Sequence, residues 1–379
     1  MSFKPLNRTA PSPVQLMDDA AEPAALHAIG VAQAELGRFA EARSNLGQAL
    51  AARQALSQRD PRNAQYRADV ASTRVAQGRL AWTSGRLAEA VGIWRDVRQL
   101  MSADIAANPN EPVLAQQLVQ TEVVMGQSYA ENALWGEAAE AIGLAVKHGL
   151  SDRTLSVTRL SLLAVLRERD TLLQLVPELL DRYGKTSEPL VASGLARWCS
   201  LVPGAVPDSE HIVVLAQEAP LFGHTGAARS FNLSLAEYRA GRFQGAIHHA
   251  HESLEFIKTD KAGPFEALNG SILTMAYHRL GQHDEAKRWL ARIIEIDWQA
   301  VGHWPSPASW WDRSDFLTLK REAIELVTGK PAPDDPWLRE LRAGAYAQLN
   351  EPAKADAERA AANTARSGPG GSRKTGSTP

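Results

Sequence analysis

The sequence predicts an all-α fold, a right-handed superhelical solenoid built from antiparallel helix pairs. One observation is a repeated motif, in which a turn precedes a helix whose apolar and small residues lie on one face. Another is a fixed period, because Gly30, Gly78 and Gly126 are separated by 48 residues (78 − 30 and 126 − 78), within the range of repeat architectures. The motif occurs as GRFAEARSNLGQAL from Gly37, GRLAEAVGIWRDV from Gly85 and ALWGEAAEAIGLAV from Ala133.

Composition excludes several classes of protein. The chain has 379 residues, of which 44% are apolar and 22% charged, values typical of a folded, water-soluble chain. A formal net charge of −2 gives no general attraction to nucleic acid or to a membrane surface, so neither is expected as a partner. The single cysteine, Cys199, cannot form an internal disulfide and indicates a reducing, cytoplasmic setting.

Both ends of the chain are predicted to be flexible. Residues 1–20 have prolines between polar residues and lack the apolar core of a signal peptide, so we expect a flexible leader. Residues 365–379 are rich in Gly, Ser and Pro, so we expect a disordered tail. No apolar run between them is long enough to cross a bilayer.

Residues 21–150 are predicted to form three long helix pairs. Breaker clusters around Pro61 and Pro109 separate one pair from the next. Gly30, Gly78 and Gly126 fall in the first helix of each pair, where a glycine costs roughly 1 kcal/mol relative to alanine. We therefore expect these glycines to allow a neighbouring helix to approach closely.

Residues 151–220 lose the period but keep the helical pattern. They are interpreted either as degenerate repeats or as a helical spacer. The expected helices are Ser151–Arg167, Thr171–Tyr183, Glu188–Cys199 and Asp208–Glu218.

The repeat returns with a shorter period in residues 221–364, since Gly241 and Gly281 are 40 residues apart (281 − 241). An insertion rich in Trp and Pro follows the second of these repeats. After it we expect a helix from about Phe316 to Val327 and a last helix pair that begins at Trp337.

Several repeats resemble the tetratricopeptide repeat family. The likeness is carried by Leu273, Tyr277, Gly281 and Ala286, and again by Gly126, Tyr129, Trp135, Ala138 and Ala145. In that family the helix pairs stack, and the first helices line a concave surface that binds extended peptides or partner helices. The resemblance implies a protein-interaction scaffold without enzymatic activity.

A second resemblance concerns serine/threonine kinases. The strings YRAGRFQGAI, AYHRLGQHDEAKRWL and SWWDRSDFLTLKREAIELV are similar to the repeat-bearing, non-catalytic C-terminal regions of planctomycete-type serine/threonine protein kinases. This chain lacks a Gly-rich phosphate loop, an HRD loop and a DFG motif; the nearest strings are Arg167–Asp170 and Asp315–Leu317. The alternative interpretation is therefore a regulatory or sensory array of a kinase system, without the catalytic domain.

The phase of the repeats predicts partner-binding residues on the concave surface. Their aromatic and basic character suits a protein or peptide partner with acidic and apolar residues, although a merely solvated inner face fits the pattern equally well. The places where chaperone-binding members of the family hold a C-terminal carboxylate correspond to His27 and Val31, so that ligand is not expected. The candidates are Arg79, Trp82, Gln127, Phe231, Tyr238, Arg239, Met275, His278 and Arg279.

No metal site or cofactor is expected. His248, His249 and His251 form a cluster, but the repeat phase places them on a solvated face without a recognised ligand motif. Cys199 fits a small core residue rather than a nucleophile. The tryptophans in and after the insertion fit a plug between helix layers better than a ligand box. They are Trp298, Trp304, Trp310 and Trp311.

Overall fold

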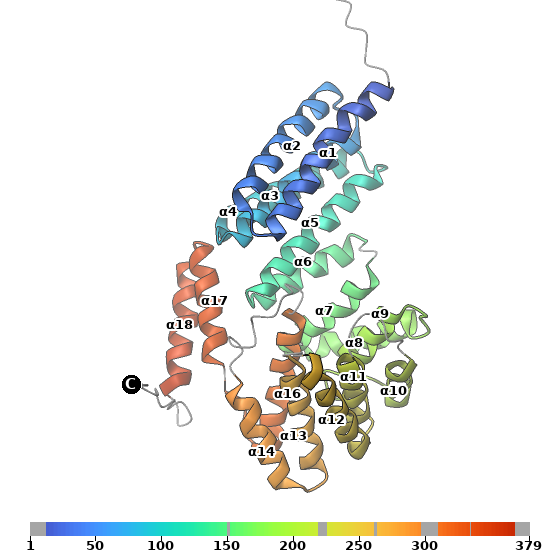
Figure 1. Ribbon diagram of the computed structural model, residues 1–379, viewed down its shortest axis with the longest axis vertical. Coiled ribbons are helices and arrows are strands. Elements are labelled where there is room, and N and C mark those ends of the chain that lie inside the picture. Colours follow the sequence, from blue (N-terminus) through green and yellow to red (C-terminus); the bar gives the residue numbers. More distant parts are fainter. Residues whose placement is uncertain are drawn as a thin grey trace, which may run out of the picture. The chain divides into compact units, whose positions relative to one another are not determined.

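A computed structural model of the chain describes residues 13–149, 152–218, 226–260, 264–296, 310–333 and 335–367. Within these ranges the chain forms α-helices joined by turns, and no strand is found there (Figure 1). The all-α repeat fold is therefore confirmed. Residues 13–20 of the predicted leader and 365–367 of the predicted tail are helical, whereas Trp298, Trp304 and the rest of both ends lie outside the described residues.

The N-terminal helices form three pairs that follow the predicted period. Their second helices begin at Phe39, Leu87 and Trp135, the first residues of the repeated apolar pattern. The bounds are α1 Pro13–Glu35, α2 Phe39–Arg59, α3 Ala64–Thr83, α4 Leu87–Ala107, α5 Pro112–Glu131 and α6 Trp135–Lys147.

The middle and C-terminal helices also follow the predicted order. α16 begins six residues before the expected Phe316, because Trp310 is buried and extends the packed face of this helix. The bounds are α7 Arg153–Val165, α8 Arg169–Tyr183, α9 Pro189–Cys199, α10 Ser209–Glu218, α11 Gly226–Arg239, α12 Phe243–Asp260, α13 Pro264–Arg279, α14 His283–Glu295, α16 Trp310–Thr328, α17 Pro336–Gln348 and α18 Pro352–Ser367.

One turn conformation recurs in most of the described helix pairs. The residue two places before the second helix has a positive φ, a region that favours glycine because other residues carry a Cβ. The next amide donates a hydrogen bond of 2.8–3.0 Å to the carbonyl five residues earlier, which closes the end of the first helix. The turn residues are Gly37 (φ 74°), Gly85 (76°), Ala133 (57°), Arg167 (62°), Gly241 (77°), Gly281 (75°) and Asn350 (60°).

This turn shows that α7 and α8 are paired as in the regular repeats, although their sequence period is lost. α9 and α10 lack it and are joined by a longer connection that contains Gly204.

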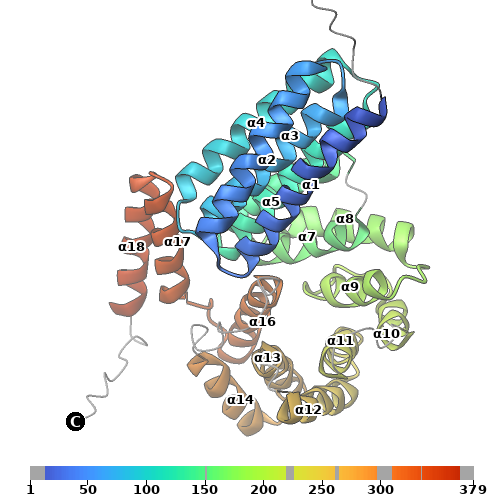
Figure 2. The same ribbon diagram turned by 45° about the horizontal axis from the view of Figure 1, so that its top comes forward.

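The chain divides into two compact units. The first contains Met1–Ser128, with the short segments Lys147–Gly149 and Ala345–Pro352, and the second contains the remainder. In the first unit α1 packs on α2, α2 on α3 and α3 on α4. In the second unit α7, α9, α11 and α13 each contact the next helix of this series, and α16 contacts both α13 and α7 (Figure 2). This row of helices therefore closes on itself.

Glycines in the first unit allow close helix approach, as predicted. A Cβ built at Gly78 would lie 2.3 Å from Nε1 of Trp94, and one built at Gly30 would lie 2.8 Å from Cγ of Leu46. Trp94 has no exposed surface, and its indole N–H donates to the carbonyl of Val75 at 3.1 Å. The large side chain of the second helix thus occupies the space that the glycine leaves.

Replacing Gly78 with alanine should destabilise the first unit. The gain of roughly 1 kcal/mol in helix propensity is outweighed, because overpacking against the buried Trp94 costs about 1–3 kcal/mol. Gly92→Ala is the matched control, since Gly92 is exposed on α4 with no atom within 4 Å of the new Cβ. In thermal or urea unfolding, Gly78→Ala should melt earlier than wild type and Gly92→Ala slightly later; the same stability for both variants would contradict this packing.

Candidate functional site

In the second unit, α7, α9, α11 and α13 form a row that we call the inner row, and another helix of the same chain, α16, contacts this row. α16 packs along α7 and α13, and its side chains bond to residues of α9 and α11. Of these helices, α11 and α13 carry the partner-binding candidates of the second unit. Its contacts combine buried charges with apolar side chains. Both kinds of contact decide which of the predicted site residues have a free surface.

Arg197 of α9 is the centre of the buried charges. Its Nε donates to Oδ2 of Asp315 at 2.6 Å, and its Nη2 donates to Oδ1 of Asp312 at 2.5 Å. The guanidinium also lies 5.2 Å from the ring centroid of Phe231, within cation–π range. Two carboxylates of α16 thus compensate one buried cation of α9.

Asp315 has no exposed side-chain surface and accepts further hydrogen bonds. Its Oδ2 accepts from the indole N–H of Trp198 at 3.1 Å, and its Oδ1 accepts from Ser161 Oγ of α7 at 2.5 Å. Burial raises the pKa of Asp315 to about 6, and the charge of Arg197 opposes that rise. The network therefore ties α7, α9 and α16 together around a carboxylate that is costly to bury.

A second arginine joins α11 to α16. Arg239 binds both carboxylate oxygens of Glu322 at 2.6 Å. Its Nε and Nη2 also donate to the carbonyls of Ser200 and Leu201, at 2.6 and 2.9 Å, just after the end of α9. A bidentate guanidinium–carboxylate pair of this kind fixes orientation as well as contributing energy.

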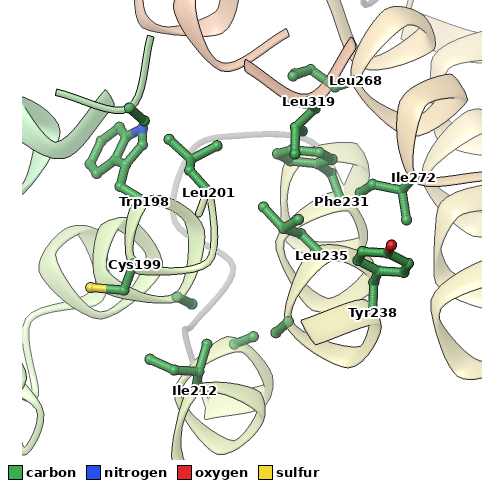
Figure 3. Packing of buried hydrophobic residues seen from close by; sticks show 14 of the residues in the cluster. Trp198, Cys199, Leu201, Ile212, Phe231, Leu235, Tyr238, Leu268, Ile272 and Leu319 are labelled. Atoms are coloured by element: carbon green, nitrogen blue, oxygen red, sulfur yellow. The ribbon is translucent and has the colours of Figure 1, made fainter. Parts of the chain in front are cut away.

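Apolar side chains complete this contact (Figure 3). Leu319 of α16 points towards Phe231 of α11 and Leu268 of α13, and none of the three has any exposed surface. These residues belong to one continuous hydrophobic core that includes residues from α7 to α16. α16 is packed here as part of the core of this unit.

Several predicted partner-binding residues have no free surface for this reason. Phe231 and Met275 are completely buried, and Tyr238 is 5% exposed. A partner cannot contact them without a rearrangement of the unit. Arg239 is held by Glu322, so its guanidinium is already used within the chain.

The two remaining candidates of the second unit lie at the end of α13. Arg279 is exposed and His278 is half-buried. Burial is the main cause that raises the pKa of Tyr238, and a hydrogen bond from Arg279 opposes it. His278 is 5.0 Å from His283 between ring centroids, and burial lowers its pKa, with the charges of His283 and Arg279 acting in the same direction.

The candidates of the first unit differ in accessibility. Trp82 is 4% exposed and packs on Trp94, with ring centroids 5.6 Å apart. Arg79 and Gln127 are half-buried on α3 and α5, and Arg79 donates to Ser128 Oγ at 2.8 Å. Arg79 and Gln127 occupy equivalent places, because they are 48 residues apart (127 − 79).

The other groups considered for chemistry have structural contacts. His251 lies 3.1 Å from the Tyr277 hydroxyl and near the Trp289 ring, and His249 lies 3.1 Å from Glu252. Among the described residues no group of three or more His, Cys, Asp or Glu side chains is arranged to hold a metal ion.

Cys199 is buried, and burial raises the pKa of its thiol far above its usual range, so it is not a thiolate at neutral pH. Trp310 and Trp311 pack on each other, with ring centroids 5.6 Å apart. No helix in the described part of the chain has the length and hydropathy needed to cross a membrane.

Comparison with known proteins adds one match. Residues 273–297, which cover the end of α13, the turn at Gly281 and α14, match the family model described as tetratricopeptide repeat. Comparison with curated proteins gives no match. The repeat match and the all-α fold together support a tetratricopeptide-repeat type of protein.

Sequence reasoning missed the network around Arg197. The pattern that could have indicated it is the spacing of Asp312, Asp315 and Glu322, which lie three and seven residues apart and therefore on one face of a helix. Apolar residues such as Leu319 lie on the same helix. An acidic–apolar helix and arginines on the inner row are complementary.

Replacing Asp315 with asparagine should strongly destabilise the second unit. Removing one partner of a buried ion pair costs about 3–5 kcal/mol, and because Asp312 still pairs with Arg197 we expect a loss near the lower end of this range. The control is Glu89→Gln, which breaks the exposed Arg86–Glu89 pair and should change stability by about 0–1 kcal/mol. Both are measured by chemical unfolding.

A triple variant tests the cause of that loss. Arg197→Met with Asp312→Leu and Asp315→Leu removes all three buried charges, and should recover most of the stability lost in Asp315→Asn. Wild-type stability of Asp315→Asn, or a triple variant less stable than the single one, would contradict the account of the network.

Proposed function

We propose that the chain is a non-enzymatic scaffold that binds a partner peptide or helix on the inner surface of its repeats. The observation that carries this proposal is α16, a helix whose buried residues are both acidic and apolar and which packs on α7 and α13. It supports the idea that the inner row of such repeats accommodates a helix. In the second unit this surface is already filled, so we look for the partner site in the first unit.

A half-exposed stripe on α3 and α5, which we call the inner row of the first unit, supports this assignment. Its residues recur at spacings of three and four, so they share one face on each helix. The stripe contains Ser72, Ala76, Arg79 and Thr83 on α3 and the equivalent Gln120, Val124 and Gln127 on α5. It offers amide and hydroxyl groups, small apolar side chains and the guanidinium of Arg79, which also has interactions within the chain.

The chemistry of α16 guides the proposal for the partner. In the second unit, arginines of the inner row bind acidic residues of α16, and apolar residues between these acids fill the core. Arg79 is the corresponding cation of the first unit. The partner is therefore proposed to be a peptide or helix with at least one acidic residue flanked by apolar ones. A regulatory role in a serine/threonine kinase system stays a prediction, without an observation that favours it.

The proposed function is tested by selecting a phage-displayed random peptide library on the full-length chain. We expect enrichment of peptides with acidic and apolar residues. Their binding should weaken at least about tenfold in Arg79→Glu, since charge reversal converts an attraction into a repulsion. Arg95→Glu, an exposed arginine on α4, is the matched control and should leave the affinity unchanged.

Two results would contradict the proposal. One is the absence of any enriched family of peptides. The other is a set of peptides whose binding is equal in wild type and Arg79→Glu, with circular dichroism showing that both are folded.

A further inference from the structure

The outer face of α1 carries apolar side chains that nothing covers among the described residues. Ile29 is 48% exposed, Leu36 is 70% exposed and Phe39, at the start of α2, is 37% exposed. Ala25 and Ala32 are exposed on the same face of α1 as Ile29, because these residues recur at spacings of four and three, while Leu36 directly follows α1 and Phe39 begins α2. We call these five residues the end face.

Three of the five equivalent residues of the second repeat, 48 positions later, are buried, and the other two, Gln77 and Ser84, are polar and partly exposed. Thr73 replaces Ala25 and is 0% exposed, Leu80 replaces Ala32 and is 3% exposed, and Leu87 replaces Phe39 and is 4% exposed. Thr73 accepts a hydrogen bond of 2.7 Å from Arg53 of α2, and Leu80 packs in a cluster with Leu46 of α2. The face of the second repeat is therefore covered by the helix pair before it.

The third repeat repeats this pattern. Met125, equivalent to Ile29, is 2% exposed, and Trp135, equivalent to Phe39, is 4% exposed. Met125 Sδ accepts a hydrogen bond of 3.4 Å from Nη2 of Arg98, a residue of the preceding helix α4. The end face of the first repeat thus has the composition of a surface that receives a helix, and contiguous exposed apolar residues of this kind mark interaction sites.

We propose that the end face binds the end face of a second copy of this chain. Two copies of α1 would lie antiparallel about a twofold axis, so that the same surface is used twice and the assembly closes as a dimer. One register places two of the large residues over alanines: Ile29 over Ala32 of the second copy, and Leu36 over Ala25 of the second copy. The end face therefore fits itself, with large side chains filling the spaces above alanines.

The charges at the border of the end face agree with this register. It places Glu22 beside the end of α1 of the second copy, and therefore near Arg38 in the turn that follows that helix. Both side chains are exposed, and neither has an ion-pair partner within the described part of the chain. The twofold axis produces this ion pair twice. A parallel arrangement of the two helices would instead place each charge beside its own copy.

Sedimentation equilibrium of the full-length chain tests the dimer. Wild type should show a concentration-dependent monomer–dimer equilibrium, and Ile29→Glu should be monomeric because it buries a charge in the apolar contact. Leu100→Glu is the matched control, since Leu100 is 53% exposed on α4 outside the end face; it should dimerise as wild type does. A wild type that is monomeric at every concentration, or a dimer unaffected by Ile29→Glu, would overturn the proposal.

Charge reversal tests the register. Glu22→Arg and Arg38→Glu should each weaken the dimer about tenfold, because each creates two like-charge contacts worth together roughly one factor of ten. The double variant restores opposite charges and should dimerise nearly as wild type. Melting curves establish that all variants are folded. A double variant as weak as the singles would refute the antiparallel register.

Discussion

The second unit depends on one constraint, the burial of the Arg197 guanidinium. A guanidinium stays charged in a protein, so α9 can occupy the interior only where acids reach this cation. α16 supplies two such acids, Asp312 and Asp315. Because Asp315 is itself bound by Ser161 and Trp198, the position of α16 also fixes α7 against α9. The inner row is therefore arranged around a charge, and the apolar core fills the space that remains.

The local structure of the chain was predictable because it depends on neighbouring residues. The recurrent turn glycines, such as Gly37 and Gly281, mark places where the backbone enters the left-handed region, and the residues after them begin a helix. The glycines within first helices were also informative. Glycine is a poor helix former, so Gly78 indicates that another side chain, here Trp94, occupies the space where a Cβ would lie. Period, turns and helix order follow from such rules.

The candidate site was less predictable, for a physical reason. A helical period states which residues share a face, but it does not state what covers that face. Phe231 in α11 and Met275 in α13 are completely buried, so neither of these predicted binding residues faces solvent. In the sequence, Asp315 resembles an ordinary polar residue in an interruption of the repeat. Only the folded chain brings it to Arg197, 118 residues away.

Closure by α16 also changes the folding behaviour expected of a repeat protein. In an open array each repeat contacts only its neighbours, so stability is a sum of local terms and the ends can fray separately. Ser161 and Asp315 are 154 residues apart in the chain, and their contact converts the row of helices into a loop. Such long-range contacts raise contact order and slow folding. They also remove the free ends from which an array unravels, so the second unit should gain and lose its structure as a single cooperative body.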